Sequence, residues 1–228
     1  MTGQGSADEP SARRRSPTRR GSASEEKILS AAKELFLSDR YDGVNLERVA
    51  DRAGVSRQTV YNRFGSKEAV FRAMVGYHWS AFAGPDRHVV DYGADASAEE
   101  VLYGFARALQ RFAAETDQIR FARLVVAESA RLPWIADEFY RLGKGPVVAA
   151  FVERLDALVH SGALRCPDTY LAARQFMGLI QEFLVWPRVM AFDEEVAAGP
   201  TPQTVIEEAV RVFLACYAPA PNDSARLD

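Results

Sequence analysis

The sequence is poor in the residues that build disulfide, metal and catalytic sites. Its 228 residues include two cysteines and three histidines. Cys166 and Cys216 lie in separate segments and do not form a disulfide framework, so we expect both to serve in packing. His78, His88 and His160 lack the paired spacing of metal ligands, and no nucleophile stands with a matching base. We therefore expect no metal, no cofactor and no enzymatic activity.

Long apolar runs are absent as well. No segment reaches the roughly 18 to 20 apolar residues that a membrane span requires, and the N-terminus is polar and rich in arginine. The alternation typical of strands is missing, and no internal repeat is visible. The sequence thus predicts an all-α, cytoplasmic protein with no membrane partner. Its 48% of hydrophobic residues suffices for one or two buried cores.

Charge is divided unevenly along the chain, which has a net charge of -3. Residues 1–80 hold 14 Lys and Arg against 10 Asp and Glu, a net of +4, whereas the remainder holds 14 against 21, a net of -7. Because clustered basic residues attract polyanions, this division predicts a nucleic-acid-binding N-terminal region. The acidic remainder is suited to a different task.

A helix, a tight turn and a second helix are predicted between residues 44 and 65. Apolar residues from Leu46 to Ala53 recur at helical spacing, and Asn45 precedes them as an N-cap. Gly54 is placed to end this helix in a left-handed conformation. Ser56 is placed to cap the next helix. This order is typical of a helix-turn-helix, in which one helix is held against the DNA major groove.

The second of these helices presents a polar face. At about 100° per residue, Val60 and Phe64 point into the core. Gln58 and Asn62 point directly away from it. Amide, hydroxyl and phenol groups on such a face can reach base edges, and flanking arginines can reach phosphates. The predicted contacts to double-stranded DNA are Asn45, Ser56, Arg57, Gln58, Thr59, Tyr61, Asn62, Arg63 and Lys67.

Lys67 follows the predicted cap Ser66 of the next helix. The helix dipole disfavours a cation at this end, so a phosphate in front of the lysine would account for the residue. The alternative is a solvated lysine that costs a few tenths of a kcal/mol. The residue alone does not decide between them, and the neighbouring helix-turn-helix favours phosphate.

Residues 50–69 resemble the DNA-binding domain of the TetR/AcrR family of transcriptional regulators. Two positions depart from the family pattern: Asn45 stands where threonine is more frequent, and Asn62-Arg63 where histidine is frequent. The preferred base sequence therefore cannot be carried over. The likeness covers residues 25 to about 79 and depends on four short segments: Gly54-Val55-Ser56, Thr59-Val60-Tyr61, Phe64 and Ser66-Lys67-Glu68-Ala69.

The resemblance implies a homodimeric regulator, most often a repressor, that a small-molecule effector releases from a palindromic operator. The effector would bind in the C-terminal domain and move the two DNA-binding domains apart. The alternative is a ligand-independent DNA-binding protein with a structural or constitutive role. A second domain without an internal cavity would favour that alternative.

The C-terminal region has more aromatic residues than a plain spacer requires. Polar residues stand on or beside its apolar stretches, so an apolar cavity with a few polar groups is possible. The candidate ligand-binding residues are Trp79, Phe82, Phe105, Phe112, Arg123, Glu128, Trp134, Phe139, Gln175 and Phe176.

Two helices, predicted at 168–189 and 202–217, are apolar nearly all round. Such a helix is either central to its domain or shared with another subunit. We favour a dimer interface, because two DNA-binding domains related by a two-fold axis match a palindromic site. The predicted interface residues are Phe176, Ile180, Phe183, Leu184, Ile206, Val210 and Phe213.

The predicted organisation has four parts: a disordered basic arm (1–21), a helix-turn-helix domain (22–79), a ligand-binding and dimerisation domain (80–217) and a disordered tail (218–228). The arm either enters the minor groove and follows phosphates or remains a solvated tail. Helices are expected from about 24, from 67 to before 84, and at 98–115, 118–130, 134–161, 168–189 and 202–217. Gly143, Gly145 and Pro146 threaten to break the longest of them.

Overall fold

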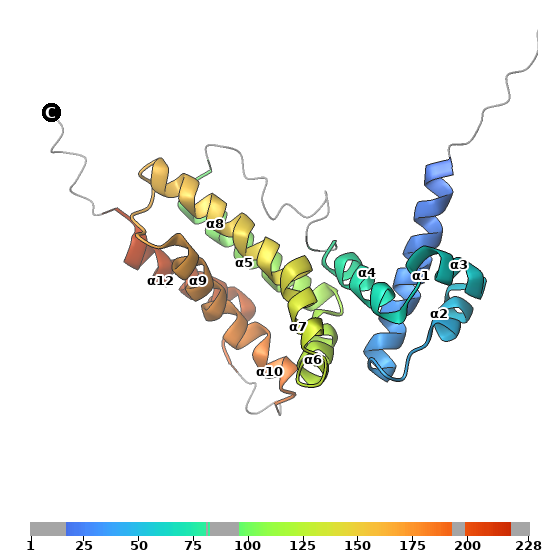
Figure 1. Ribbon diagram of the computed structural model, residues 1–228. Helices are drawn as coiled ribbons and strands as arrows, with labels where there is room; N and C mark the ends of the chain where they lie inside the picture. Colours follow the sequence, from blue (N-terminus) through green and yellow to red (C-terminus); the bar gives the residue numbers. More distant parts are fainter. Residues whose placement is uncertain (1–16, 81, 83–95, 193–198, 220–228) are drawn as a thin grey trace, which may run out of the picture.

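The computed structural model describes residues 17–80, 82, 96–192 and 199–219, and these ranges contain helices and no strand. The predicted all-α fold is confirmed. Figure 1 shows the helices of residues 17–80 as one group beside a second group formed by the remaining helices. The elements are α1 (Pro17–Asp39), α2 (Leu46–Ala53), α3 (Arg57–Phe64), α4 (Lys67–Ser80), α5 (Ala98–Glu115), α6 (Gln118–Ser129), α7 (Pro133–Phe139), the π-helical turn η1 (Tyr140–Lys144), α8 (Gly145–His160), α9 (Thr169–Leu184), α10 (Trp186–Val189) and α12 (Pro202–Tyr217).

The helix ends predicted around the turn are confirmed. The side chain of Asn45 accepts a hydrogen bond from the backbone N–H of Arg48 at 2.8 Å. Ser56 does the same for Thr59 at 3.1 Å. Gly54 has a φ of 65°, the left-handed conformation that ends α2. Short-range hydrogen bonds thus fix where α2 ends and α3 begins.

The buried residues form two separate cores. One lies within α1–α4, which we call the N-terminal unit, and extends into α6 and α7 through Phe121, Leu124 and Ile135. The other lies between α5, α8, α9 and α12, which we call the four-helix core. Helices α6 and α7 belong by sequence to the predicted second domain, but they share the core of the first. The chain therefore packs as two bodies whose boundary is not at residue 79.

The long helix predicted at 134–161 is three elements. Pro146 has no N–H to donate to a carbonyl in the preceding turn, and the glycines on either side of Lys144 are poor helix formers. The backbone widens there into the π-helical turn η1 before α8 continues. Turns of this kind occur most often at functional sites.

Other boundaries also differ from the prediction. Helix α1 begins at Pro17 and not near Ser24, in keeping with the preference of proline for the first turn of a helix. Residues 1–16 of the predicted arm lie outside the described residues, as do residues 220–228 of the predicted tail. Cys166 is buried, whereas Cys216 is exposed, so the expected packing role fits only Cys166.

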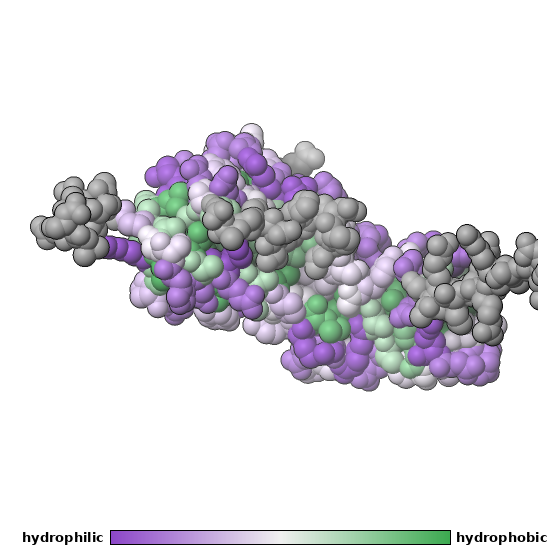
Figure 2. All heavy atoms as spheres, turned by 90° about the horizontal axis from the view of Figure 1, so that it is seen from above, coloured by the Kyte–Doolittle hydropathy of each residue, from purple (hydrophilic) through white to green (hydrophobic). Residues whose placement is uncertain are grey.

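Among the described helices, none combines the length and apolar character needed to cross a bilayer. Seen from above, hydrophilic side chains cover most of the surface (Figure 2).

A candidate DNA-binding face and an apolar cavity

The outer side of α3 carries the amides predicted to read DNA. Gln58 and Asn62 are exposed one turn apart, and Nε2 of Gln58 donates a hydrogen bond to Oδ1 of Asn62 at 2.5 Å. Tyr61 beside them is 48% exposed, whereas Val60 on the opposite side is fully buried. The buried side holds α3 to the N-terminal unit, so the polar side chains project outward from a fixed helix.

The two predicted phosphate-binding arginines flank this face and lie near carboxylates. Arg57 pairs with Glu47 at 2.9 Å, and Arg63 lies 3.6 Å from Glu25. Exposed ion pairs of this kind contribute about 0 to 1 kcal/mol. A phosphate can therefore replace the carboxylate as partner at small cost.

Lys67 has partners inside its own domain. Its Nζ donates a weak hydrogen bond to the carbonyl oxygen of Asp42 at 3.4 Å and lies 4.3 Å from the centroid of the Tyr41 ring. Partial burial lowers the pKa of the lysine. The side chain is thus held against the loop between α1 and α2, and a phosphate contact requires it to turn outward.

An apolar cavity of about 100 Å³ lies where the two cores meet. A space of this order accommodates one ring-sized apolar group. Its wall draws on α4 to α9 and on the segment that follows α9. The lining residues are Trp79, Leu109, Phe112, Gln118, Ala122, Phe139, Lys144, Val147, Met177, Ile180, Gln181, Leu184, Val185, Trp186 and Val189.

Of the seven aromatic residues predicted to bind ligand, three line this cavity: Trp79, Phe112 and Phe139. Three others, Phe82, Phe105 and Phe176, pack within the four-helix core, and the seventh, Trp134, packs on the N-terminal unit. Burial alone did not distinguish a side chain that fills a core from one that faces a cavity.

The predicted polar residues Arg123 and Gln175 have other partners. Arg123 donates to the backbone carbonyl of Val189 at 3.1 Å and to that of Arg188, so it holds the end of α10 against α6. Gln175 accepts a hydrogen bond from the hydroxyl of Tyr217 at 3.0 Å. Neither residue lines the cavity.

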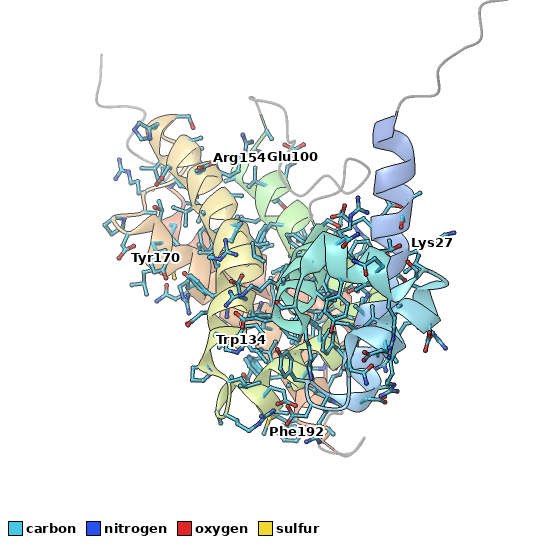
Figure 3. The ribbon with its side chains drawn as sticks, turned by 45° about the vertical axis from the view of Figure 1, so that its right-hand side comes forward. Lys27, Glu100, Trp134, Arg154, Tyr170 and Phe192 are labelled. Atoms are coloured by element: carbon cyan, nitrogen blue, oxygen red, sulfur yellow. The ribbon has the colours of Figure 1, made fainter. Side chains whose placement is uncertain are left out.

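Glu128 and Trp134, also predicted to bind ligand, join α6 and α7 to the N-terminal unit. Glu128 is buried, accepts from the backbone N–H of Tyr41 at 3.4 Å and pairs with Arg131 at 2.8 Å. The Trp134 ring packs edge-on against Tyr41 and Phe71, at 5.5 and 5.4 Å between centroids (Figure 3). These contacts fix α6 and α7 to the N-terminal unit.

The polar residues that do line the cavity, Gln118, Lys144 and Gln181, were not among the candidates. Lys144 could have been suspected, because it lies between the two glycines that threaten the predicted long helix. For the glutamines the sequence contains no such signal, since amphipathic helices place many similar residues at their edges.

His78 connects α4 to one of these glutamines. Its Nε2 donates to Oε1 of Gln118 at 2.8 Å, and the rings of Phe112 and Phe121 pack against it. Burial lowers the pKa of His78 to about 4, so the imidazole is neutral at pH 7. Helices α4 and α6 are therefore joined by a buried hydrogen bond at the cavity edge.

Only one of the predicted dimer residues is exposed in the single chain: Phe183 on α9, at 53%. Leu184 is buried and lines the cavity. The other five are at most 2% exposed and belong to the four-helix core: Phe176, Ile180, Ile206, Val210 and Phe213. Of these, Ile180 also lines the cavity. Other apolar side chains on the same helices, and on the segment after α9, are exposed: Leu171, Leu179, Val212, Trp186 and Met190.

Comparison with known proteins gives a consistent result for both parts of the chain. Residues 28–74 match the family described as bacterial regulatory proteins, tetR family, and residues 100–219 match the C-terminal domain of AefR-like transcriptional repressors. Among curated proteins, the chain is 34% identical over 91 residues to the HTH-type transcriptional regulator AlkX of Mycobacterium tuberculosis, and 37% identical over 51 residues to the HTH-type transcriptional activator FasR of Mycolicibacterium smegmatis. These matches cover 39% and 22% of this chain and span 40% and 23% of the relatives.

Solved structures match over most of the chain. A putative TetR-family transcriptional regulator from Mesorhizobium loti has a TM-score of 0.73 at 26% identity, covering 88% of this chain and 99% of the other. The flavonoid-responsive regulator FrrA has a TM-score of 0.70 at 27% identity, covering 87% and 98%.

Proposed function

The chain belongs to the TetR family of DNA-binding transcriptional regulators, and from this premise we propose that it is a homodimeric repressor that a small ligand, bound in the apolar cavity, releases from its operator. The observation that carries the proposal is the position of α4. It begins at Lys67, three residues after the DNA-reading helix α3 ends at Phe64, and its penultimate residue, Trp79, lines the cavity.

A ligand can regulate DNA binding only if it favours one placement of the reading helix over another. Trp79 forms part of the cavity wall and its indole is packed closely against Gly143, so a ligand that presses on this ring would push on the end of α4. The rest of α4 packs inside the N-terminal unit through Val70, Phe71 and Met74. A shift at one end therefore moves the whole DNA-binding unit.

The exposed apolar side chains of α9 and α12 support the homodimer. Leu171, Leu179 and Phe183 lie on α9 and Val212 lies on α12, and all four are exposed in the single chain. Pairing these faces in two copies would bury them and relate two reading helices by a two-fold axis. Two related helices match two half-sites of a palindrome. The flavonoid-responsive relative FrrA supports the role of a small molecule.

The DNA-binding part is tested by fluorescence anisotropy on DNA tiled across the region that flanks the gene of this protein. We expect saturable binding to one near-palindromic tile, weakened by about 1 to 3 kcal/mol in Gln58→Ala. The control is Gln203→Ala on α12, because both glutamines donate to a side chain four residues later, at 2.5 Å from Gln58 and 2.6 Å from Gln203. Equal, weak binding to every tile, abolished by salt, would contradict the proposal.

The ligand part is tested on the same tile with the cavity partly filled by Ala122→Leu. We expect single-ring aromatic compounds to weaken DNA binding by the wild-type protein and to have less effect on this variant. If DNA binding by the wild type responds to none of them, the ligand-independent alternative is favoured.

A further inference from the structure

We propose that the cavity selects an amphipathic anion: a compact apolar body enclosed by the cavity, with a carboxylate held at its rim by Lys144 and Arg174. The inference takes from the proposed function only that this cavity is a ligand site. It adds the chemical class of the ligand and the residues that recognise its charge.

Lys144 is the only Lys or Arg among the cavity-lining residues within the described chain. It is half-buried at the end of η1, and burial together with the charge of Arg174 lowers its pKa. Within the described ranges it forms no ion pair with a carboxylate, whereas Arg141 in the same turn pairs with Glu138 at 2.7 Å. A desolvated cation without a counter-ion is costly, and a bound anion would remove this cost.

Arg174 brings a second cation to the same side of the cavity. Tyr170, Arg174, Met177 and Gln181 follow one another at intervals of four, three and four residues, which places them along one stripe of α9. The last two line the cavity, so the stripe runs from the cavity wall to an exposed arginine and tyrosine. Figure 3 shows Tyr170 on the side of the larger domain away from the N-terminal unit.

Two tyrosine hydroxyls complete the group. Nη1 of Arg174 donates to the hydroxyl of Tyr170 at 3.3 Å, and the guanidinium lies 5.7 Å from the centre of that ring. A hydrogen bond with Tyr140 of η1, together with Arg174, lowers the pKa of Tyr170. Both hydroxyls can donate to an oxyanion, and both cations attract one. Among the described residues, neither Lys144 nor Arg174 forms an ion pair with a carboxylate.

The remaining wall determines the body of the ligand. It is formed mainly by aromatic and aliphatic side chains, among them Phe112, Phe139 and Leu184, around a space of about 100 Å³. A space of this order suits a body no larger than a single ring whose substituents lie at the rim, and a cation of the same shape would be repelled by Lys144 and Arg174. The geometry thus favours single-ring carboxylates over neutral or basic compounds.

The test compares two probes of nearly equal shape, 4-isopropylbenzoate and its neutral isostere 4-isopropylbenzamide. Binding to the full-length protein is measured by calorimetry and by tryptophan fluorescence, since Trp79 and Trp186 both line the cavity. We expect the carboxylate to bind at least tenfold more tightly than the amide at low salt.

Variants then assign the preference to its residues. Lys144→Met should abolish the preference for the carboxylate, Lys144→Arg should retain most of it, and Arg174→Gln should reduce it several-fold. The matched control is Arg107→Gln: Arg107 stacks on Tyr103 of α5 at 5.4 Å, as Arg174 stacks on Tyr170, but does not line the cavity. Thermal unfolding of each variant shows whether it is folded.

Each outcome has one meaning. Equal binding of the two probes, no saturable binding of either, or a preference that survives in Lys144→Met would overturn the inference. If both probes bind equally and still release the protein from DNA, the proposed function is supported and the preference for a carboxylate is not. Selective binding of the carboxylate with no change in DNA affinity would uphold the inference and contradict the release mechanism.

Discussion

The indole of Trp79 packs directly against the backbone of Gly143, so closely that a β-carbon on this glycine would lie 2.0 Å from Nε1 of the indole. No side chain larger than hydrogen fits there without displacing the ring. The last turn of α4 is thereby held against η1, and η1 carries Lys144. The turn that carries Lys144 at the cavity rim thus packs directly against α4, the helix that leads to the DNA-reading helix.

Replacing Gly143 with alanine should therefore affect both stability and regulation. We expect Gly143→Ala to lower the free energy of unfolding by about 1 to 3 kcal/mol, the usual cost of overpacking, as measured by urea denaturation. Gly76→Ala in α4 is the control, because a β-carbon there meets nothing within 4 Å. It should instead be neutral or stabilise the protein by up to about 1 kcal/mol. Equal destabilisation by both changes would contradict the tight contact.

The hydrogen bond between Gln58 and Asn62 predicts a non-additive effect on DNA binding. Either alanine substitution should remove about 1 to 3 kcal/mol of specific binding, because each amide can make a bidentate contact with adenine. The double variant should lose less binding free energy than the two single variants added together, because each single change also removes the hydrogen-bond partner of the remaining amide. Anisotropy titrations of the operator and a scrambled duplex measure this cycle. Strict additivity would indicate that the two side chains act independently.

Lys67 should contribute charge without sequence preference. If it turns away from Tyr41 to meet a phosphate, Lys67→Gln should weaken binding to all duplexes alike and reduce the salt dependence by about one ion per DNA-binding domain. Arg211→Gln on α12 controls for the loss of a positive charge, because Arg211 pairs with Glu208 at 2.6 Å, outside the N-terminal unit. An unchanged salt slope would show that the lysine keeps its contact with Tyr41.

Burial of His78 makes stability depend on pH. Its pKa is about 4 in the folded protein and near 6.5 when exposed, so the unfolded chain binds the extra proton first as pH falls. The free energy of unfolding should fall between about pH 6.5 and pH 4, by up to roughly 3 kcal/mol from this group. Urea midpoints across this range should show a smaller drop in His78→Leu than in wild type or in His160→Gln, whose histidine is exposed. Identical pH profiles for His78→Leu and wild type would contradict this assignment.

The parts of the fold that depend on near neighbours in sequence could be predicted. Asn45, Gly54 and Ser56 end or begin helices through hydrogen bonds within three to five residues. Such local chemistry is visible in the sequence itself. Helical periodicity likewise predicted that Val60 and Gln58 lie on opposite sides of α3, one buried and one exposed.

The cavity could not be predicted, because it depends on which helices become neighbours. Periodicity indicates that Phe105 and Phe112 both face inward from α5, and both belong to the four-helix core, but only the arrangement of the other helices brings Phe112 to the cavity as well. Trp134 was expected at a ligand and packs instead on Tyr41, about 93 residues earlier in the chain. Its partner is set by the packing of α7 on the N-terminal unit.

The length of α4 determines how small a tilt at the cavity is enough to displace the DNA-reading helix. Its 14 residues span about 21 Å, so a tilt of roughly 6° about one end displaces the other by about 2 Å. In the proposed dimer the two-fold axis doubles this to about 4 Å between the reading helices, slightly more than the rise of one base pair. Two helices that matched half-sites one turn of DNA apart would then be out of register by a full base pair.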